Sequence, residues 1–158
     1  MRILHFLDTL NRGGAETQVL DICRNAGDFG LEMTFVTAQG GVMEKEFQQT
    51  DVDFYKLNRR FPVDLYLASQ LRKIIKERDI QIVHGYQPVE GLHLQIAARG
   101  LKTVKKVLSF QGGMSPDWKN RRAVKFLIPR MDANVVASRG LKKWHAETDN
   151  FDTENFTV

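Results

Sequence analysis

Short apolar, β-branched segments alternate along this chain with segments of helical periodicity, and no other feature constrains the fold as strongly. Such alternation is typical of βαβ units, in which parallel strands are covered by helices. The 158 residues suffice for one globular domain with a sizeable core. We therefore predict an α/β fold with an open parallel sheet and helices on both of its faces.

The expected elements follow from the positions of the apolar residues. The clearest helix covers about residues 64–78, where Leu67, Leu71 and Ile75 recur at helical spacing. Other helices are expected after Gly14, around Phe47, over residues 89–99 and after Ser138. A basic segment near residues 119–125 receives no predicted element. Strands are expected at residues 2–7, 33–38, 52–57, 80–84, 106–110, 133–137 and from 155 onward.

A pair of glycines stands where the first strand passes into the first helix. The run is Asn11-Arg12-Gly13-Gly14-Ala15-Glu16. Adjacent glycines permit positive φ and a close approach to a ligand, and the first helical N–H groups favour a bound anion. Gly13 and Gly14 are therefore candidates for contacting a phosphate, although a tight turn alone explains the pair equally well.

Polar and glycine residues also follow several strands, at the edge where ligands of open parallel sheets bind. His84 can serve as a general base or as a hydrogen-bond donor, because the reference pKa of histidine lies near neutrality; a structural role is an equal alternative. Gln87 and Gln111 can recognise sugar hydroxyls, although glutamines near turns are usually only solvated. Four stretches converge there: residues 10–14, 40–41, 84–88 and 110–113.

Charge and composition narrow the function classes. The net charge is +4, with clusters around Arg72–Lys76 and Arg121–Lys125 that suit anionic partners. Nucleic acid is disfavoured as a partner because helix-turn-helix, aromatic RNA-binding and zinc patterns are missing from the sequence. The four histidines lack metal-ligand spacing, so we expect no bound metal. The single cysteine and the lack of a long apolar run predict a cytoplasmic location.

Several segments in a characteristic order resemble the N-terminal domain of the retaining glycosyltransferases of family 4. Those enzymes have the GT-B architecture, with two Rossmann-like domains. The resemblance covers nearly the whole chain and implies a Rossmann-like fold that forms one half of GT-B. The segments that carry it are Met1 to Val36, Asp79 to His84, Gly91 to Arg99 and Asp132 to Ser138.

The resemblance also implies roles for individual residues. Gly13 and Gly14 would contact the diphosphate of a nucleotide-sugar donor, and His84 would be catalytic. Gln111 departs from the family, since many members have a histidine there, and this puts one contact with the donor sugar or reaction centre in doubt. No cofactor is implied beyond the nucleotide sugar as substrate. The residues expected to bind acceptor or sugar are Asn11, Arg12, Tyr86, Gln87, Gln111 and Gly112.

By the same resemblance, residues 1–158 form the acceptor-binding domain of a hexosyltransferase that acts on a glycan or lipid-linked acceptor in cell-surface polysaccharide or glycolipid biosynthesis. A strand begins at the last residues, so we expect a cut at a domain junction, with the C-terminal donor-binding domain outside this chain. The isolated piece is expected to be inactive. The basic faces allow contact with an anionic membrane at its inner surface.

Two other functions stay open. A non-catalytic Rossmann-like module could bind a phosphate-bearing ligand or a protein partner with the same fold. A nucleotide-sugar epimerase or an inverting transferase could also use a two-domain protein of this type.

Overall fold

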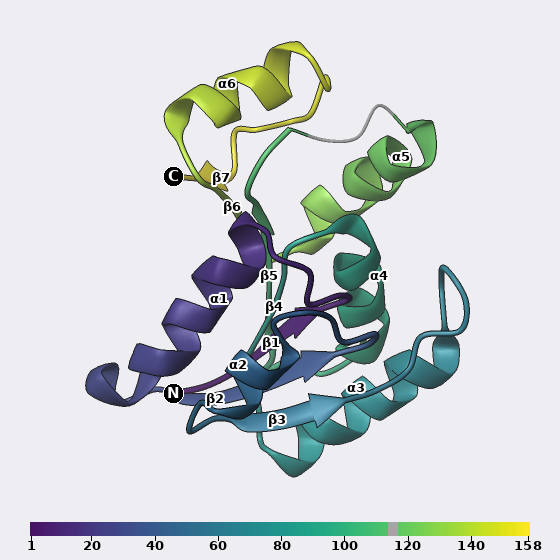
Figure 1. The fold of residues 1–158 in the computed structure, drawn as a ribbon. Coiled ribbons are helices and arrows are strands. Elements are labelled where there is room, and N and C mark those ends of the chain that lie inside the picture. The colour runs from purple at the N-terminus through teal and green to yellow at the C-terminus, as the bar shows by residue number, and fades with distance from the viewer. Residues whose placement is uncertain (114–116) are drawn as a thin grey trace.

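The computed structural model describes residues 1–113 and 117–158, and its sheet has seven strands, all of whose neighbours are parallel (Figure 1). The strands are Arg2–Leu7 (β1), Glu32–Thr37 (β2), Asp53–Lys56 (β3), Ile82–Gly85 (β4), Lys105–Phe110 (β5), Ala133–Val136 (β6) and Phe156–Thr157 (β7). The helices are Gly14–Asn25 (α1), Glu44–Gln48 (α2), Leu65–Glu77 (α3), Pro88–Ala97 (α4), Trp118–Leu127 (α5) and Arg139–Glu147 (α6), with 3₁₀ turns at Ala26–Phe29 (η1) and Ile128–Arg130 (η2).

The strand order is β3-β2-β1-β4-β5-β6-β7. The chain builds outward from β1 to β3, then crosses back and builds outward in the other direction from β4. Strands β1 and β4 are therefore neighbours whose connections leave in opposite directions, and His5 lies opposite His84 in their register. A crevice beyond the carboxyl ends of two such strands is the usual ligand site of an open α/β sheet.

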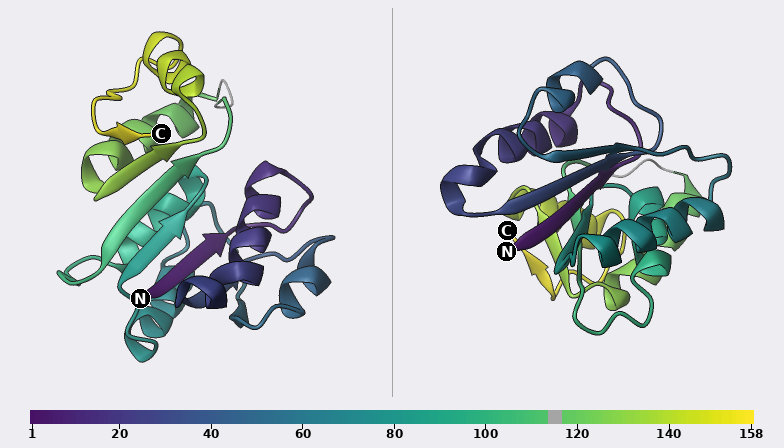
Figure 2. Two further views of the ribbon diagram at one scale, coloured as in Figure 1. Left: turned by 90° about the vertical axis from the view of Figure 1, so that its left-hand side faces the viewer. Right: turned by 90° about the horizontal axis from the view of Figure 1, so that it is seen from below.

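Alternating side chains of the sheet pack against helices on both faces. Phe6 points into a core formed with α3 and α4, whereas its neighbour Leu7 points into a core formed with α1 and α2. In the right-hand view of Figure 2, α1 and α2 lie above the strands and α3 and α4 lie below them. A third core packs α5 against β5 and β6. The predicted α/β fold with both faces covered is confirmed.

The helix α5 was missed in the sequence. Only Val124 and Leu127 of this helix are buried, and its exposed Trp118 and Phe126 blur the apolar periodicity on which prediction depends. Asp117 caps α5 by accepting a hydrogen bond from the backbone N–H of Lys119 at 3.0 Å. An aspartate at this position is the sequence signal that could have predicted the start of the helix.

The glycine pair does not use positive φ, so that part of the prediction was wrong. Gly13 is extended at φ −151° and caps α1, while Gly14 is the first helical residue. A Cβ on Gly13 would lie 2.5 Å from Oε2 of Glu16, so the missing side chain admits that carboxylate at the amino end of α1. In the neighbouring loop after β2, by contrast, Gly40 and Gly41 do have positive φ.

Candidate functional site

Two adjoining pockets open beyond the carboxyl ends of β1, β4 and β5, with volumes of about 150 and 260 Å³. They share Gln87, Pro88 and Asn120 at the predicted edge, and we call the two adjoining pockets together the hollow. Gln111 and Gly112 line the smaller pocket, and Ala15 and Glu16 at the start of α1 line the larger one. The lining thus offers amide groups on one side and the amino end of a helix on the other.

The carboxylate of Glu90 joins the two loops that form the larger pocket. It is buried and accepts backbone N–H bonds from Asp8 at 2.9 Å, Tyr86 at 2.6 Å and Gln87 at 2.8 Å. Together with Gln87 it forms a capping box at the amino end of α4. Burial raises the pKa of Glu90 to about 8, and the three N–H bonds oppose that rise. Glu90 therefore fixes the ends of β1 and β4 relative to each other.

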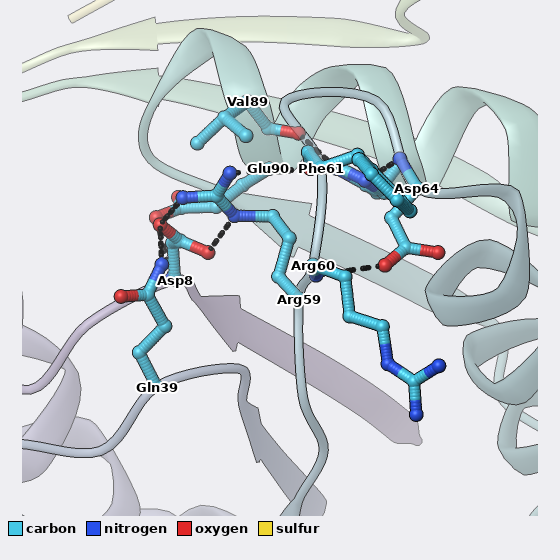
Figure 3. Close-up of polar contacts among 9 residues, drawn as sticks. Asp8, Gln39, Arg59, Arg60, Phe61, Asp64, Val89 and Glu90 are labelled. Atoms are coloured by element: carbon cyan, nitrogen blue, oxygen red, sulfur yellow. Dashed lines mark hydrogen bonds and ion pairs between the residues drawn. The ribbon is translucent and has the colours of Figure 1, made fainter.

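A second carboxylate, Asp8, receives a bidentate ion pair from Arg59 (Figure 3). The Asp8 oxygens lie 2.6 Å from Nε and 2.7 Å from Nη2 of Arg59, and Gln39 donates to the same carboxylate at 3.2 Å. The fork geometry of a guanidinium matches a carboxylate in this way. The pair fastens the loop between β3 and α3 to the carboxyl end of β1, beside the larger pocket.

A third buried carboxylate, Asp64, caps α3 and stiffens the same loop (Figure 3). It accepts N–H bonds from Arg60, Tyr66 and Leu67, and these bonds lower its pKa. Its own backbone N–H donates to Nε2 of His93 at 2.9 Å. Nδ1 of that neutral imidazole lies 2.7 Å from the carbonyl of Val89, so α4 anchors the start of α3.

His84 lies within β4, on the sheet face covered by α1. Its Nε2 is 2.6 Å from the hydroxyl of Ser109, and its Nδ1 is 3.4 Å from the hydroxyl of Tyr86. The Tyr86 hydroxyl lies 2.8 Å from Nδ1 of His5, and the rings of His84 and Tyr86 stack. Burial lowers the pKa of His84 to about 4, so its imidazole is neutral at neutral pH. His84 does not line either pocket, and its catalytic role stays a prediction.

The structure brings some of the other predicted residues together and separates the rest. Tyr86, Gln87, Gln111 and Gly112 line the smaller pocket, although the Tyr86 hydroxyl is turned into the core. The Gln111 amide donates to the side-chain oxygen of Gln18, so it links the end of β5 to α1.

Asn11 and Arg12 do not line the two pockets. Both are exposed, and Arg12 pairs with Glu46 of α2 at 2.8 Å. Their expected contact with acceptor or sugar is therefore a prediction without a pocket beside it.

The two basic faces use some of their cations internally. Arg72 donates to the carbonyls of Ala97 and Arg99 at the end of α4. Arg121 lies 3.0 Å from the buried carboxylate of Asp149. These two guanidinium groups thus stabilise the fold, which reduces the charge that the faces offer to a partner.

Sequence reasoning missed Asp8, Arg59, Glu90 and Asn120. The capping box was readable in the order Gln87, Pro88 and Glu90. The other positions carry no local signal. Within residues 1–113 and 117–158, no three histidine, cysteine or acidic side chains are placed to hold a metal ion. In the same part of the chain, no helix is long and apolar enough to cross a membrane.

Comparison with known proteins supplies the family. The sequence model described as Glycosyltransferase Family 4 matches residues 12–158. A glycosyltransferase from Rickettsia africae superposes with a TM-score of 0.80 at 17% identity, over 99% of this chain and 42% of that one. HepE of Anabaena, in complex with UDP and glucose, has a TM-score of 0.76 at 17% identity, over 100% and 43%.

An epimerase shares the fold as well. The UDP-GlcNAc 2-epimerase of Neisseria meningitidis, bound to UDP-GlcNAc, has a TM-score of 0.63 at 12% identity, over 100% of this chain and 45% of that one. The chain thus spans less than half the length of each of these three proteins. No curated protein matches the sequence.

Proposed function

This chain belongs to glycosyltransferase family 4, and from that premise we propose that it is the acceptor-binding half of a retaining glycosyltransferase. The whole enzyme would transfer a hexose from a nucleotide sugar to a glycan or lipid-linked acceptor in cell-surface polysaccharide or glycolipid synthesis. A donor-binding domain would follow residue 158. The observation that carries the proposal is the hollow beside the β1 and β4 ends, whose smaller pocket is lined by three amide residues: Gln87, Gln111 and Asn120.

Each group in the hollow has a defined part in the proposed reaction. The amides are uncharged donors and acceptors, which suit acceptor hydroxyls, and the amino end of α1 offers N–H groups to a diphosphate. Glu16 now occupies that amino end, so a diphosphate at Gly13 and Gly14 requires its carboxylate to swing outward. Such groups would act by positioning the acceptor and by stabilising the departing diphosphate.

His84 takes a positioning part in this proposal. Ser109 holds the imidazole, whose ring stacks on Tyr86 and so supports a residue that lines the smaller pocket. We place the enzyme in the cytoplasm, peripherally at the inner face of the membrane where a lipid-linked acceptor would lie. The UDP bound by HepE and the UDP-GlcNAc bound by the epimerase support UDP sugars as the first donors to try.

Steady-state kinetics of the full-length protein test the proposal. We would assay UDP sugars with soluble glycan acceptors, comparing Gln87→Ala and Asn120→Ala with Gln81→Ala, an exposed amide at the opposite, amino edge of the sheet. Loss of one hydrogen bond to the acceptor should raise its KM about tenfold. The Gln81 variant should match the wild type.

Product analysis separates the alternatives. Retention at the anomeric carbon, followed by NMR, supports the proposal, and inversion indicates the inverting transferase. Interconversion of UDP-GlcNAc without an acceptor indicates the epimerase. Absence of any reaction with all nucleotide sugars would favour the non-catalytic binding module.

A further inference from the structure

Large apolar side chains are exposed to solvent near the starts of two helices. Before and at the start of α3, Phe61 is 64% exposed, Val63 49%, Leu65 68% and Tyr66 61%, and Trp118 at the start of α5 is 61% exposed. We call these five residues the apolar rim. Exposed apolar side chains that cluster in this way usually mark a surface that contacts a partner or a membrane.

The sheet topology places both parts of the rim at one edge. The segment before α3 leaves the carboxyl end of β3, and α5 follows the carboxyl end of β5. All strands are parallel, so these ends share an edge with the two pockets. In Figure 1 and in the right-hand view of Figure 2, the loop before α3 and the start of α5 project on the same side of the molecule.

The loop that carries most of the rim is firmly anchored. Arg59 binds Asp8 through two hydrogen bonds, the Arg60 N–H binds Asp64, and the Asp64 N–H binds His93 (Figure 3). The apolar side chains are thus held outward by polar contacts beneath them. Their exposure is built into the loop and does not come from a fraying end.

Cations accompany the aromatic rings of the rim. The Arg60 guanidinium lies 6.0 Å from the centre of the Tyr66 ring. Lys119 Nζ and the Arg122 guanidinium lie 5.9 and 5.6 Å from the Trp118 ring. Aromatic rings beside basic groups suit the headgroup region of a bilayer that carries anionic lipids.

From these contacts we propose that the apolar rim seats this domain on an anionic lipid surface, so that the two pockets open toward the headgroups. The inference deepens the proposed function, on which it rests, by naming the face that meets the membrane. It assigns the contact to the rim and its cations Lys119 and Arg122, and not to Arg72 and Arg121, which bind groups of the protein itself. A protein partner is a poorer occupant, because it would have to desolvate the cations of the rim and pair them with its own acidic groups.

Vesicle flotation of the full-length protein tests this inference. We would compare phosphatidylcholine vesicles with and without phosphatidylglycerol, using wild type, Phe61→Ser, a double variant Arg60→Gln and Arg122→Gln, and Phe29→Ser. Phe29 is 77% exposed in the turn between α1 and β2, at the amino edge, so it is a matched control.

Wild type and Phe29→Ser should bind the anionic vesicles equally, and Phe61→Ser should weaken binding about tenfold. The double variant should lose the preference for phosphatidylglycerol. Equal binding to both vesicle types, or equal loss for Phe29→Ser and Phe61→Ser, would overturn the inference. The inference would also be overturned if Phe61→Ser dissociated a dimer or a protein complex but left vesicle binding unchanged.

Transfer to a soluble acceptor distinguishes the failure of this inference from that of the proposed function. Transfer without vesicle binding would support the transferase and would contradict the membrane contact of the apolar rim. Vesicle binding that depends on Phe61, with no transfer to any acceptor, would support the membrane contact and would contradict the transferase. Circular dichroism of each variant excludes loss of the fold as the cause.

Discussion

At the residue scale, three carboxylates hold the carboxyl edge together. Asp8, Asp64 and Glu90 each accept hydrogen bonds from more than one group, and each is largely buried. A buried carboxylate is tolerated only where such partners replace its hydration. The loops around the pockets are therefore positioned by the ion pair at Asp8 and by the hydrogen bonds at Asp64 and Glu90.

The Arg59 and Asp8 pair gives a first prediction. Arg59→Gln should lower the free energy of unfolding by about 1 to 3 kcal/mol, because it leaves a mostly buried carboxylate with one weak partner. Lys73→Gln, which breaks an exposed pair with Glu77, should cost less than about 0.5 kcal/mol. Urea unfolding measures both. Equal costs would show that the Arg59 pair is no stronger than a surface contact.

The raised pKa of Glu90 gives a second prediction, on pH. The pKa of this carboxyl is near 4.5 in the unfolded chain and about 8 when folded, because burial disfavours the charge. Between these values the folded state keeps a proton that the unfolded state releases. Stability due to Glu90 is thus complete below pH 4.5 and is lost as pH rises toward 8, by up to about 1.4 kcal/mol per pH unit.

Glu90→Gln should remove this dependence. Urea midpoints from pH 5 to 9 should fall more steeply for the wild type than for the variant, with the exposed Glu77→Gln as a control. Parallel curves for wild type and Glu90→Gln would mean that the three N–H bonds keep the carboxylate ionised in the folded state.

At the element scale, α4 is the centre of its layer, packed against α3 on one side and α5 on the other. Gly91 makes the approach to α5 and β5 possible. A Cβ at this position would lie 2.9 Å from Cδ1 of Leu127 and 3.2 Å from Cδ1 of Leu108. The closeness of these elements also brings Asn120 of α5 to the pockets.

Gly91→Ala should therefore destabilise the protein. Overpacking costs about 1 to 3 kcal/mol and exceeds the gain of up to about 1 kcal/mol in helix propensity. Gly140→Ala in α6 is the control, since its Cβ would meet only Ser138 Oγ at an ordinary 3.8 Å, and it should stabilise. Thermal unfolding compares the two, and a stabilised Gly91→Ala would show that both leucines move aside freely.

At the scale of the whole molecule, the proposed function makes this chain one wall of a site that two domains share. Its pockets lie on the open carboxyl edge, and it covers 42 to 45% of the length of the enzymes compared above. Glycosyl transfer requires donor and acceptor to be held together with water excluded. Under the proposed function, this chain supplies only one of the two walls that such a site needs.

We therefore expect residues 1–158 alone to be folded but inactive. Nucleotide release from UDP sugars in the presence of acceptor should stay at background for this piece, while the full-length protein turns over. Cooperative thermal unfolding of the piece provides the control for its fold. A rate comparable with that of the full-length protein would contradict the expectation that transfer needs a second domain.

The sequence by itself determined the α/β class, all seven strands and most of the helices, because buried parallel strands appear as short apolar, β-branched runs and helices as a 3.6-residue periodicity. Ser138 was also readable as the cap of α6, since a cap depends only on its neighbours in sequence. The prediction failed at α5, where apolar residues lie on the exposed side as well.

Tertiary structure alone decided the long-range contacts that fix the site. Asp8 meets Arg59 from 51 residues away and Glu90 from 82 residues away, through loops that the strand order brings to one edge. The burial of His84 against Ser109 and the gathering of the apolar rim depend on the same order. Local pattern specifies each strand and helix, but which strands become neighbours is set by how all their faces bury one another, and that is a property of the whole chain.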